Sequence, residues 1–193
     1  MLRTNQSFLS YARKLYEQQD RKEDIIVKKY AKGERLLVQD EVASKVMFIA
    51  EGIAKCYFTE NNDREYILEF LGTGEIIGEI ELLRQTACLC SIEAVTAVTV
   101  YAFATPYFQA LLKNDIVLNG LLLDVFAERI VNTSSRASYQ QLYTIEHSLG
   151  KLLRLQSQQG ISLPKADMAA YLGISVRSLN RELKQIGDHR ITE

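Results

Sequence analysis

Hydrophobic residues recur at helical spacing near both ends of the chain and at strand spacing between them. Apolar residues from Phe8 to Leu15 fall three or four apart, which predicts a helix before the charged stretch Glu17–Asp24. Short β-branched or aromatic runs then follow one another, separated by Gly, Asn and Asp turns. They predict eight strands: Ile25–Val27, Arg35–Val38, Val46–Ala50, Ile53–Thr59, Glu65–Leu71, Ile76–Ile77, Leu89–Ala94 and Thr96–Ala104.

Eight short strands at this spacing predict a small antiparallel β-barrel or jelly roll. From Pro106 the helical period returns, with a short helix ending near Asn114 and a long one over Ile116–Gln141. A further helix is expected over Ile145–Gln156, with Thr144 as its cap. The fold class is therefore α+β, and we divide the chain into a sensor domain (1–114), a long helix (115–142) and a C-terminal domain (143–193).

The long helix has apolar residues on more than one face. One set alternates spacings of four and three, as a heptad seam does: Ile116, Gly120, Leu123, Ala127, Ile130, Ser134, Ala137 and Gln141. Leu118, Leu121, Leu122, Val125 and Phe126 add apolar surface elsewhere on its first half. A helix that is apolar on two faces must bury both, so we expect one face to cover the barrel and the other to meet a second copy. Packing within one chain alone is the alternative.

The segment Leu163–Ile186 has the pattern of a helix-turn-helix. Pro164 suits a first helical position, Gly173 can end the first helix in the left-handed conformation, and Ser175 can cap the second. In the second helix Leu179, Leu183 and Ile186 point inward. Ser175, Val176, Arg177, Asn180, Arg181 and Lys184 lie at its start and on its outer face.

That outer face suits a DNA groove. Arg and Asn side chains can make bidentate contacts to base edges, and Lys can neutralise a phosphate. We therefore expect double-stranded DNA as a partner, with a homodimer presenting two such helices. A helical hairpin with a solvated basic face is the alternative. Residues 144–193 contain seven Lys or Arg and five Asp or Glu, so the modest positive side of the charge distribution coincides with this segment.

Composition excludes several other classes of protein. No run of eighteen apolar residues is present, and the start Met1–Gln6 lacks an apolar signal core, so we expect a cytoplasmic protein without a membrane span. The three cysteines, Cys56, Cys88 and Cys90, form neither a disulfide framework nor a zinc motif. We expect Cys88 and Cys90 to share one face of a strand as small buried residues.

The order of barrel, long helix and helix-turn-helix resembles the cyclic-AMP receptor / fumarate–nitrate regulator (Crp/Fnr) family of bacterial transcription factors. The resemblance runs from about Ile25 onward and is carried by Ile77–Leu83, Thr86-Ala87 and Pro164–Lys184. It implies a regulated DNA-binding dimer, with RNA polymerase as a further partner and a small-molecule effector bound in the barrel. The family's iron–sulfur variant needs N-terminal cysteines, and none precedes Cys56.

The resemblance also implies a site for a cyclic nucleotide, although no cofactor is established by it. In the family, Glu79 would hold the ribose hydroxyl and backbone N–H groups after Gly78 would hold the phosphate. An Arg normally precedes Thr86-Ala87, but here Gln85 does, and Arg84 lies one position early. Polar residues of the long helix, Thr133 with its neighbours Asn132 and Ser134, would complete the site. We thus take Gly78, Glu79, Arg84, Thr86, Ala87 and Thr133 as candidate effector contacts; the alternative is that Gly78 and Glu79 form only a structural turn.

The C-terminal segment departs from the family pattern in three ways. The family's base-contacting positions fall on Val176, Arg177 and Arg181, and the first of these is usually polar or basic. Glu182 stands where an apolar residue is usual. Family members continue into a β-hairpin wing, whereas we expect none before the end at Ile191–Glu193.

An enzyme is not expected. A cupin metal centre needs several histidines in the barrel, but the two histidines, His147 and His189, lie outside it. No P-loop, nucleophile elbow or Rossmann fingerprint is present. The alternative to a DNA-binding regulator is a ligand-sensing barrel whose helix-turn-helix acts through protein contacts.

Overall fold

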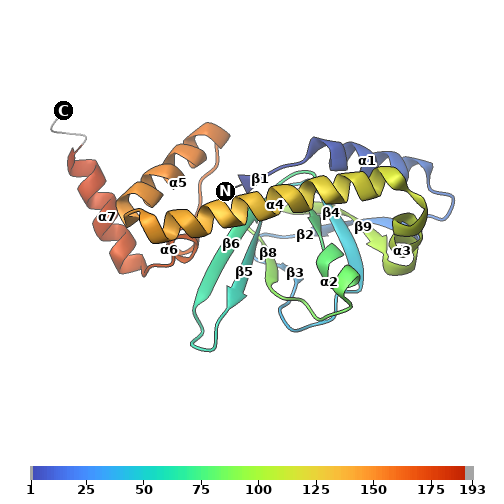
Figure 1. Ribbon diagram of the computed structural model, residues 1–193, viewed down its shortest axis with the longest axis horizontal. Helices are drawn as coiled ribbons and strands as arrows, with labels where there is room; N and C mark the ends of the chain where they lie inside the picture. Colours follow the sequence, from blue (N-terminus) through green and yellow to red (C-terminus); the bar gives the residue numbers. More distant parts are fainter. Residues whose placement is uncertain (1, 190–193) are drawn as a thin grey trace.

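Two β-sheets and a set of helices that covers their outer faces make up the protein. The computed structural model describes residues 2–189. Figure 1 shows the sheets at one end, the C-terminal helices at the other, and a long helix that runs along both. The strands are β1 (Leu2–Arg3), β2 (Ile25–Tyr30), β3 (Arg35–Leu37), β4 (Lys45–Glu51), β5 (Ala54–Thr59), β6 (Glu65–Leu71), β7 (Ile76–Ile77), β8 (Ser91–Ala94) and β9 (Val98–Ala104). The helices are α1 (Gln6–Gln18), α2 (Glu79–Arg84), α3 (Thr105–Asn114), α4 (Ile116–Leu142), α5 (Ile145–Gln159), α6 (Lys165–Leu172) and α7 (Val176–His189).

The strands form an open sandwich of the jelly-roll kind, not a closed barrel. One sheet has the order β1-β6-β5-β8-β3 and the other the order β2-β9-β4-β7. All eight predicted strands are confirmed, with ends shifted by up to three residues. The short strand β1 was not predicted; it pairs in parallel with β6, whereas the other pairs are antiparallel.

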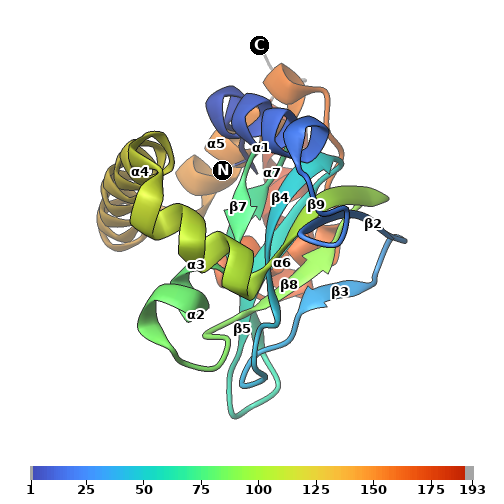
Figure 2. The same ribbon diagram turned by 90° about the vertical axis from the view of Figure 1, so that its right-hand side faces the viewer.

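Alternate residues of the strands pack in different buried clusters, of which there are three among the described residues. Met47 and Ile49 of β4 point between the sheets, while Phe48 of the same strand packs outward with Phe8 and Phe103 under α1, α3 and α4. Figure 2 shows α1 and α4 beside the four-stranded sheet. The outer face of the other sheet packs against α5, α6 and α7. Both faces of each sheet are thus buried, which explains why β4 is a nearly continuous apolar run.

The long helix α4 divides its faces as the sequence predicts. Leu118, Leu122 and Val125 are buried against the sandwich. The predicted seam lies on the opposite side and is exposed, with Ile116, Leu123 and Ile130 at 85%, 70% and 68%. α4 ends at Leu142, one residue beyond the predicted end at Gln141. Among the described residues, no helix is long and apolar enough to cross a bilayer.

The segment after β7 differs from the prediction of a turn, because it is the helix α2. Gly78 precedes this helix with φ 86°, and a Cβ there would lie 2.7 Å from the Lys45 carbonyl oxygen. Any other residue would therefore meet both backbone strain and a steric clash. This turn brings the next residue, Glu79, into the protein interior.

Candidate functional site

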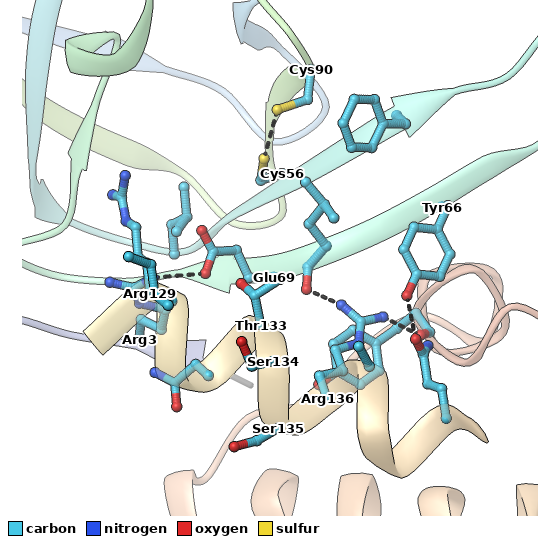
Figure 3. A pocket seen from close by; sticks show the side chains of 18 of the residues that line it. Arg3, Cys56, Tyr66, Glu69, Cys90, Arg129, Thr133, Ser134, Ser135 and Arg136 are labelled. Atoms are coloured by element: carbon cyan, nitrogen blue, oxygen red, sulfur yellow. Dashed lines mark hydrogen bonds and ion pairs between the residues drawn. The ribbon is translucent and has the colours of Figure 1, made fainter. Parts of the chain in front are cut away.

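A cavity of about 950 Å³ lies where the five-stranded sheet, α2 and α4 meet the C-terminal helices. Its walls are largely apolar and include Leu68, Ile76, Ile80, Ile92 and Leu152. The charged and polar lining comes mainly from β1, β6 and α4, and Figure 3 shows these side chains together. An apolar cavity with a few polar groups at one wall is typical of a small-molecule site.

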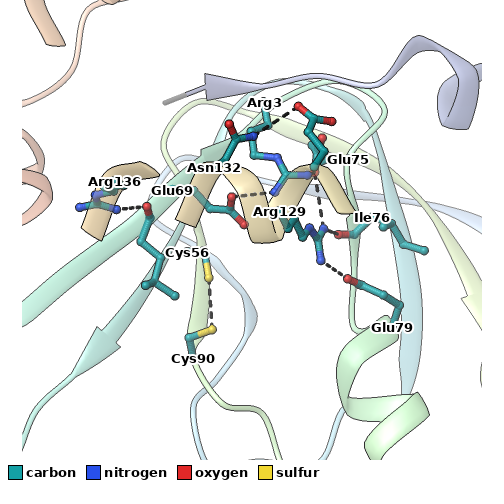
Figure 4. Close-up of polar contacts among 12 residues, drawn as sticks. Arg3, Cys56, Glu69, Glu75, Ile76, Glu79, Cys90, Arg129, Asn132 and Arg136 are labelled. Carbon is teal, nitrogen blue, oxygen red and sulfur yellow. Dashed lines mark hydrogen bonds and ion pairs between the residues drawn. The ribbon is translucent and has the colours of Figure 1, made fainter. Parts of the chain in front are cut away.

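Charged side chains form a connected network at one wall of the cavity. Arg129 of α4 pairs with Glu79 and with Glu75, at 3.5 Å for the second pair, and donates to the Ile76 carbonyl oxygen at 2.9 Å. Arg3 lies beside Glu69 at 3.0 Å and Glu75 at 3.3 Å. Figure 4 shows the two guanidinium groups among the three carboxylates. The network links Arg129 of α4 and Arg3 of β1 through the same carboxylate, Glu75.

Burial governs the protonation of this network. Burial raises the pKa of Glu79, and the charge and hydrogen bonds of Arg129 offset that rise only in part. The pKa of Glu75 is raised for the same reason, against the charges of Arg3 and Arg129. Burial alone would lower the pKa of Arg129, but the three carboxylates raise it, so this guanidinium stays charged.

Arg136, two turns further along α4, links the cavity to the C-terminal helices. Its guanidinium donates to the backbone carbonyl oxygens of Leu68 in β6 and, at 2.6 Å, of Tyr171 in α6. It also lies over the rings of Tyr66 and Tyr171, 4.9 Å and 4.0 Å from their centroids. One side chain of α4 therefore contacts the sensor sheet and the helix-turn-helix at the same time.

The helix-turn-helix has the predicted local structure. α6 ends at Gly173, with φ 70°, and the Ser175 hydroxyl accepts a hydrogen bond from the Ser178 N–H at 3.1 Å. Leu179 is fully buried, and Leu183 and Ile186 pack in the same cluster. Pro164 differs slightly from the prediction, because it caps α6 and the helix begins one residue later. A proline suits both positions, since neither needs its N–H.

The predicted DNA-contacting residues share one exposed surface at the start of α7. This surface, the reading face, consists of Ser175, Val176, Arg177, Asn180, Arg181 and Lys184, all exposed. Lys165 of α6 donates to the Asn180 side-chain oxygen at 2.8 Å. Arg181 pairs with Glu182 at 3.2 Å, which gives that charged residue a partner at its half-buried position. The expectation of a missing wing concerns Ile191–Glu193, which lie outside the described residues.

Comparisons with known proteins agree with this architecture. The family described as "Cyclic nucleotide-binding domain" matches residues 27–115. The probable transcriptional regulator flp from Lacticaseibacillus casei is 27% identical over 82% of this chain and 75% of its own. The cyclic AMP receptor protein from Thermus thermophilus is 21% identical over 84% of this chain and 77% of its own. The chain is thus similar to regulators of the Crp/Fnr family.

The solved structure of the c-di-GMP-responsive global regulator CLP from Xanthomonas campestris shares the fold. Its TM-score is 0.75 at 17% identity, over 86% of this chain and 88% of CLP. The Crp/Fnr resemblance from the sequence is thus confirmed by both the family match and the fold. The relatives are named as regulators or a receptor protein.

Only half of the candidate effector residues meet at the cavity. Gly78, Glu79 and Thr133 line it, as do Asn132 and Ser134. Arg84, Thr86 and Ala87 are exposed and are not part of its lining. The set that would surround a cyclic phosphate is therefore not gathered at this wall, and the Glu79 carboxylate faces Arg129.

Arg3, Arg129 and Arg136 are lining residues that sequence reasoning missed. A signal for two of them was present. Arg129 and Arg136 continue the buried stripe of α4 that starts at Leu118, at steps of three or four residues. An arginine on a stripe that faces the interior needs a buried acceptor, so the stripe itself indicated that such acceptors exist.

The three cysteines are placed differently from the prediction. β8 begins at Ser91, so Cys88 and Cys90 lie in the segment before it and not together in a strand. Cys88 is buried, as expected, and burial raises the pKa of its thiol to about 11. Cys90 instead faces Cys56 of β5, with 3.2 Å between the sulfur atoms. The pairing was hidden because it joins residues 34 positions apart.

Proposed function

We propose that this chain is a sequence-specific DNA-binding regulator of transcription that acts as a homodimer under the control of a small molecule. The observation that carries the proposal is the reading face: Arg177, Asn180 and Arg181 are exposed on a helix that Ser175 caps and Leu179 anchors. Relatives named as transcriptional regulators support it. Such a regulator works in the compartment that holds the DNA, the cytoplasm.

The side chains of the reading face suit two kinds of DNA contact, to base edges and to phosphates. Arg177 and Arg181 lie four residues apart on one side of α7, the spacing that lets two side chains enter the same groove. Lys184 lies one turn further on and suits a phosphate contact. Val176 is 42% exposed at the tip and suits the methyl group of a thymine.

A binding experiment tests the proposal. Full-length protein is titrated onto fragments of its own genome, and the fragment bound most tightly is used for the variants. We expect Arg177→Ala and Arg181→Ala each to weaken binding by about 1–3 kcal/mol, that is about 5- to 150-fold, because each removes a base contact. Arg154→Ala is the matched control, since it removes the same charge from an exposed position on α5.

Three results would contradict the proposal. If the double Arg177→Ala/Arg181→Ala variant binds as tightly as the wild type, α7 does not read the DNA. If Arg154→Ala weakens binding equally, the contact is unspecific electrostatic attraction. If no fragment binds at all, the helix-turn-helix acts through protein contacts.

The exposed seam of α4 supports the dimer. Ile116, Leu123 and Ile130 are 68–85% exposed and follow the heptad spacing. Val117 and Val131 widen the stripe at 59% and 63%. An apolar stripe of this length on one helix is typical of an interface with an identical helix, and the two-fold axis would bring two reading faces to one DNA site.

We assign the 950 Å³ cavity to the effector. Sensor residues such as Glu79 and C-terminal residues such as Leu172 line the same space, so a ligand there contacts both parts. An effector changes DNA binding only through a difference in its affinity for two arrangements of those parts. A cyclic nucleotide fits this cavity poorly at its phosphate, because Arg129 is already paired with Glu79 and Glu75.

A further inference from the structure

Cys56 and Cys90 form a pair of thiols at the wall of the cavity. Their sulfur atoms are 3.2 Å apart, and both residues line the cavity, as Figure 3 shows. Cys56 lies in β5 opposite Ile92 of β8, so Cys90, which lies just before β8, is near the diagonal position across from Cys56. Side chains in that relation project from the same face of a sheet. The third cysteine, Cys88, is not part of the lining.

We propose that Cys56 and Cys90 are a redox modification site, which a peroxide converts into a disulfide inside the cavity. A disulfide needs the sulfur atoms at about 2.05 Å. The two thiols are about 1 Å from that separation, a gap that small side-chain rotations can close. Cys56 is held by β5 between β6 and β8, so the movement falls to Cys90, which lies just before β8 begins.

The two thiols have different accessibility, which assigns their roles. Cys90 is half-buried, whereas Cys56 is 6% exposed. The contact with Cys90 and burial both raise the pKa of the Cys56 thiol, so it stays protonated until its partner has reacted. Cys90 is therefore the thiol that meets the peroxide, and Cys56 is the thiol that resolves the product.

The chemistry balances in two steps. The Cys90 sulfur attacks one peroxide oxygen, the O–O bond breaks, and a sulfenic acid and one water are formed. The Cys56 sulfur then attacks the Cys90 sulfur, the S–O bond breaks, and the hydroxyl leaves with a proton as a second water. Two thiols lose two electrons in total and hydrogen peroxide is reduced to two waters. A dithiol reductant reverses the change by thiol–disulfide exchange.

Thiol counting on the full-length protein tests this proposal. Protein is reduced, desalted, exposed to a small excess of hydrogen peroxide, denatured and labelled with a maleimide polymer. We expect three labels before peroxide and one after it, with three restored by dithiothreitol. Cys88→Ser is the matched control and should change from two labels to none. Cys90→Ser should form no intramolecular disulfide, and peptide mass spectrometry should identify a Cys56–Cys90 link in the wild type.

A second probe does not depend on oxidation. Phenylarsine oxide bridges two adjacent thiols and releases one water, so we expect one bound per reduced chain in the wild type and Cys88→Ser, and none in Cys90→Ser. The proposal is overturned if peroxide leaves three labels, if the linked peptides contain Cys88, or if Cys90→Ser binds the arsenical as the wild type does. Circular dichroism confirms that each variant is folded. None of these readouts depends on DNA binding.

Discussion

At the residue scale, single polar side chains decide where the helices begin. Asp115 caps α4 by accepting from the Val117 and Leu118 N–H groups at 2.8 Å and 3.1 Å, and its other oxygen accepts from the Tyr11 hydroxyl of α1 at 2.8 Å. One carboxylate thus starts the longest helix and fastens it to the N-terminal helix. Ser175 and Thr144 cap α7 and α5 in the same manner.

Replacing Asp115 separates these two contributions. Asp115→Ala removes the cap and the Tyr11 contact, and we expect a loss of about 1–2 kcal/mol in the free energy of unfolding. Asp115→Asn keeps an oxygen for the cap and should cost less than Asp115→Ala. Urea denaturation measures both. Equal losses would show that the helix N-terminus does not depend on the capping oxygen.

The comparison of the wild type with Asp115→Asn also gives a prediction about the pH dependence of stability. Burial alone would raise the pKa of Asp115, but the hydrogen bonds from Tyr11, Leu118 and Val117 lower it overall. The charged form therefore favours the folded state, and this stabilisation is complete above the ordinary pKa of an aspartate and is lost as the pH falls through the lower folded value. We expect the stability difference between wild type and Asp115→Asn to be constant above about pH 5 and to shrink below pH 4. A difference that grows on acidification would contradict the assignment.

Local rules were sufficient for some of these residues and not for others. Gly173 and Ser175 were predictable because a cap depends on neighbours within three positions. The pairing of Arg129 with Glu79 was not, because the partners are 50 residues apart in sequence. A buried arginine shows that an acceptor exists but not which of the chain's 24 acidic residues supplies it.

At the element scale, the long helix α4 has a buried stripe and an exposed seam. Its buried stripe begins with leucines over the sandwich and continues as Arg129 and Arg136 along the cavity. Its exposed seam is apolar from Ile116 to Ile130. The periodicity predicted that two faces are covered, and we propose that a second copy of the chain covers the exposed one.

A charge placed on the seam tests that interface. We expect Leu123→Glu to weaken dimerisation at least about tenfold, because both copies lose a leucine whose burial is worth about 1.5–3 kcal/mol. Val42→Glu is the matched control, since Val42 is 83% exposed but lies before β4, away from α4. Sedimentation over a range of protein concentrations measures the change. A wild type that is monomeric throughout, or equal effects of both variants, would rule out the seam as the interface.

The element that sequence reasoning assigned least well is α2. No helix is predicted over Glu79–Arg84, where the sequence suggests only a turn at Gly78 and Glu79. A pattern over so few residues cannot separate a short helix from a turn. The outcome was decided by Gly78, whose left-handed conformation starts the helix and turns Glu79 inward.

At the scale of the whole molecule, the C-terminal helices are docked on the sensor. Lys55 of β5 reaches Asp167 of α6 at 2.9 Å, with both side chains almost fully buried, and also lies near Glu93 and Glu65. Burial alone would lower the pKa of Lys55, but the hydrogen bond to Asp167 and the three carboxylates raise it. The charged pair therefore holds α6, the first helix of the helix-turn-helix, against the sheet.

Removing this lysine should loosen the docked arrangement. We expect Lys55→Met to lower the free energy of unfolding by about 3 kcal/mol, because it leaves the Asp167 carboxylate buried without its charge partner. Adding Asp167→Leu should recover part of that loss, which a double-mutant cycle measures. Lys29→Met, on the exposed side of β2, is the control and should change stability by less than about 0.5 kcal/mol. Additive losses in the cycle would show that the two side chains do not interact.

By itself, the sequence determined the elements and most of their order, because hydrophobic periods, caps and turn residues act over a few positions. It also determined the reading face, since the side chains that would meet DNA and those that anchor α7 alternate within one helix. The tertiary structure alone decided the charge network, the paired thiols and the docking of α6, because each joins residues 34 or more positions apart. Such contacts depend on how the sheets stack and where α4 crosses them, and no local pattern encodes that arrangement.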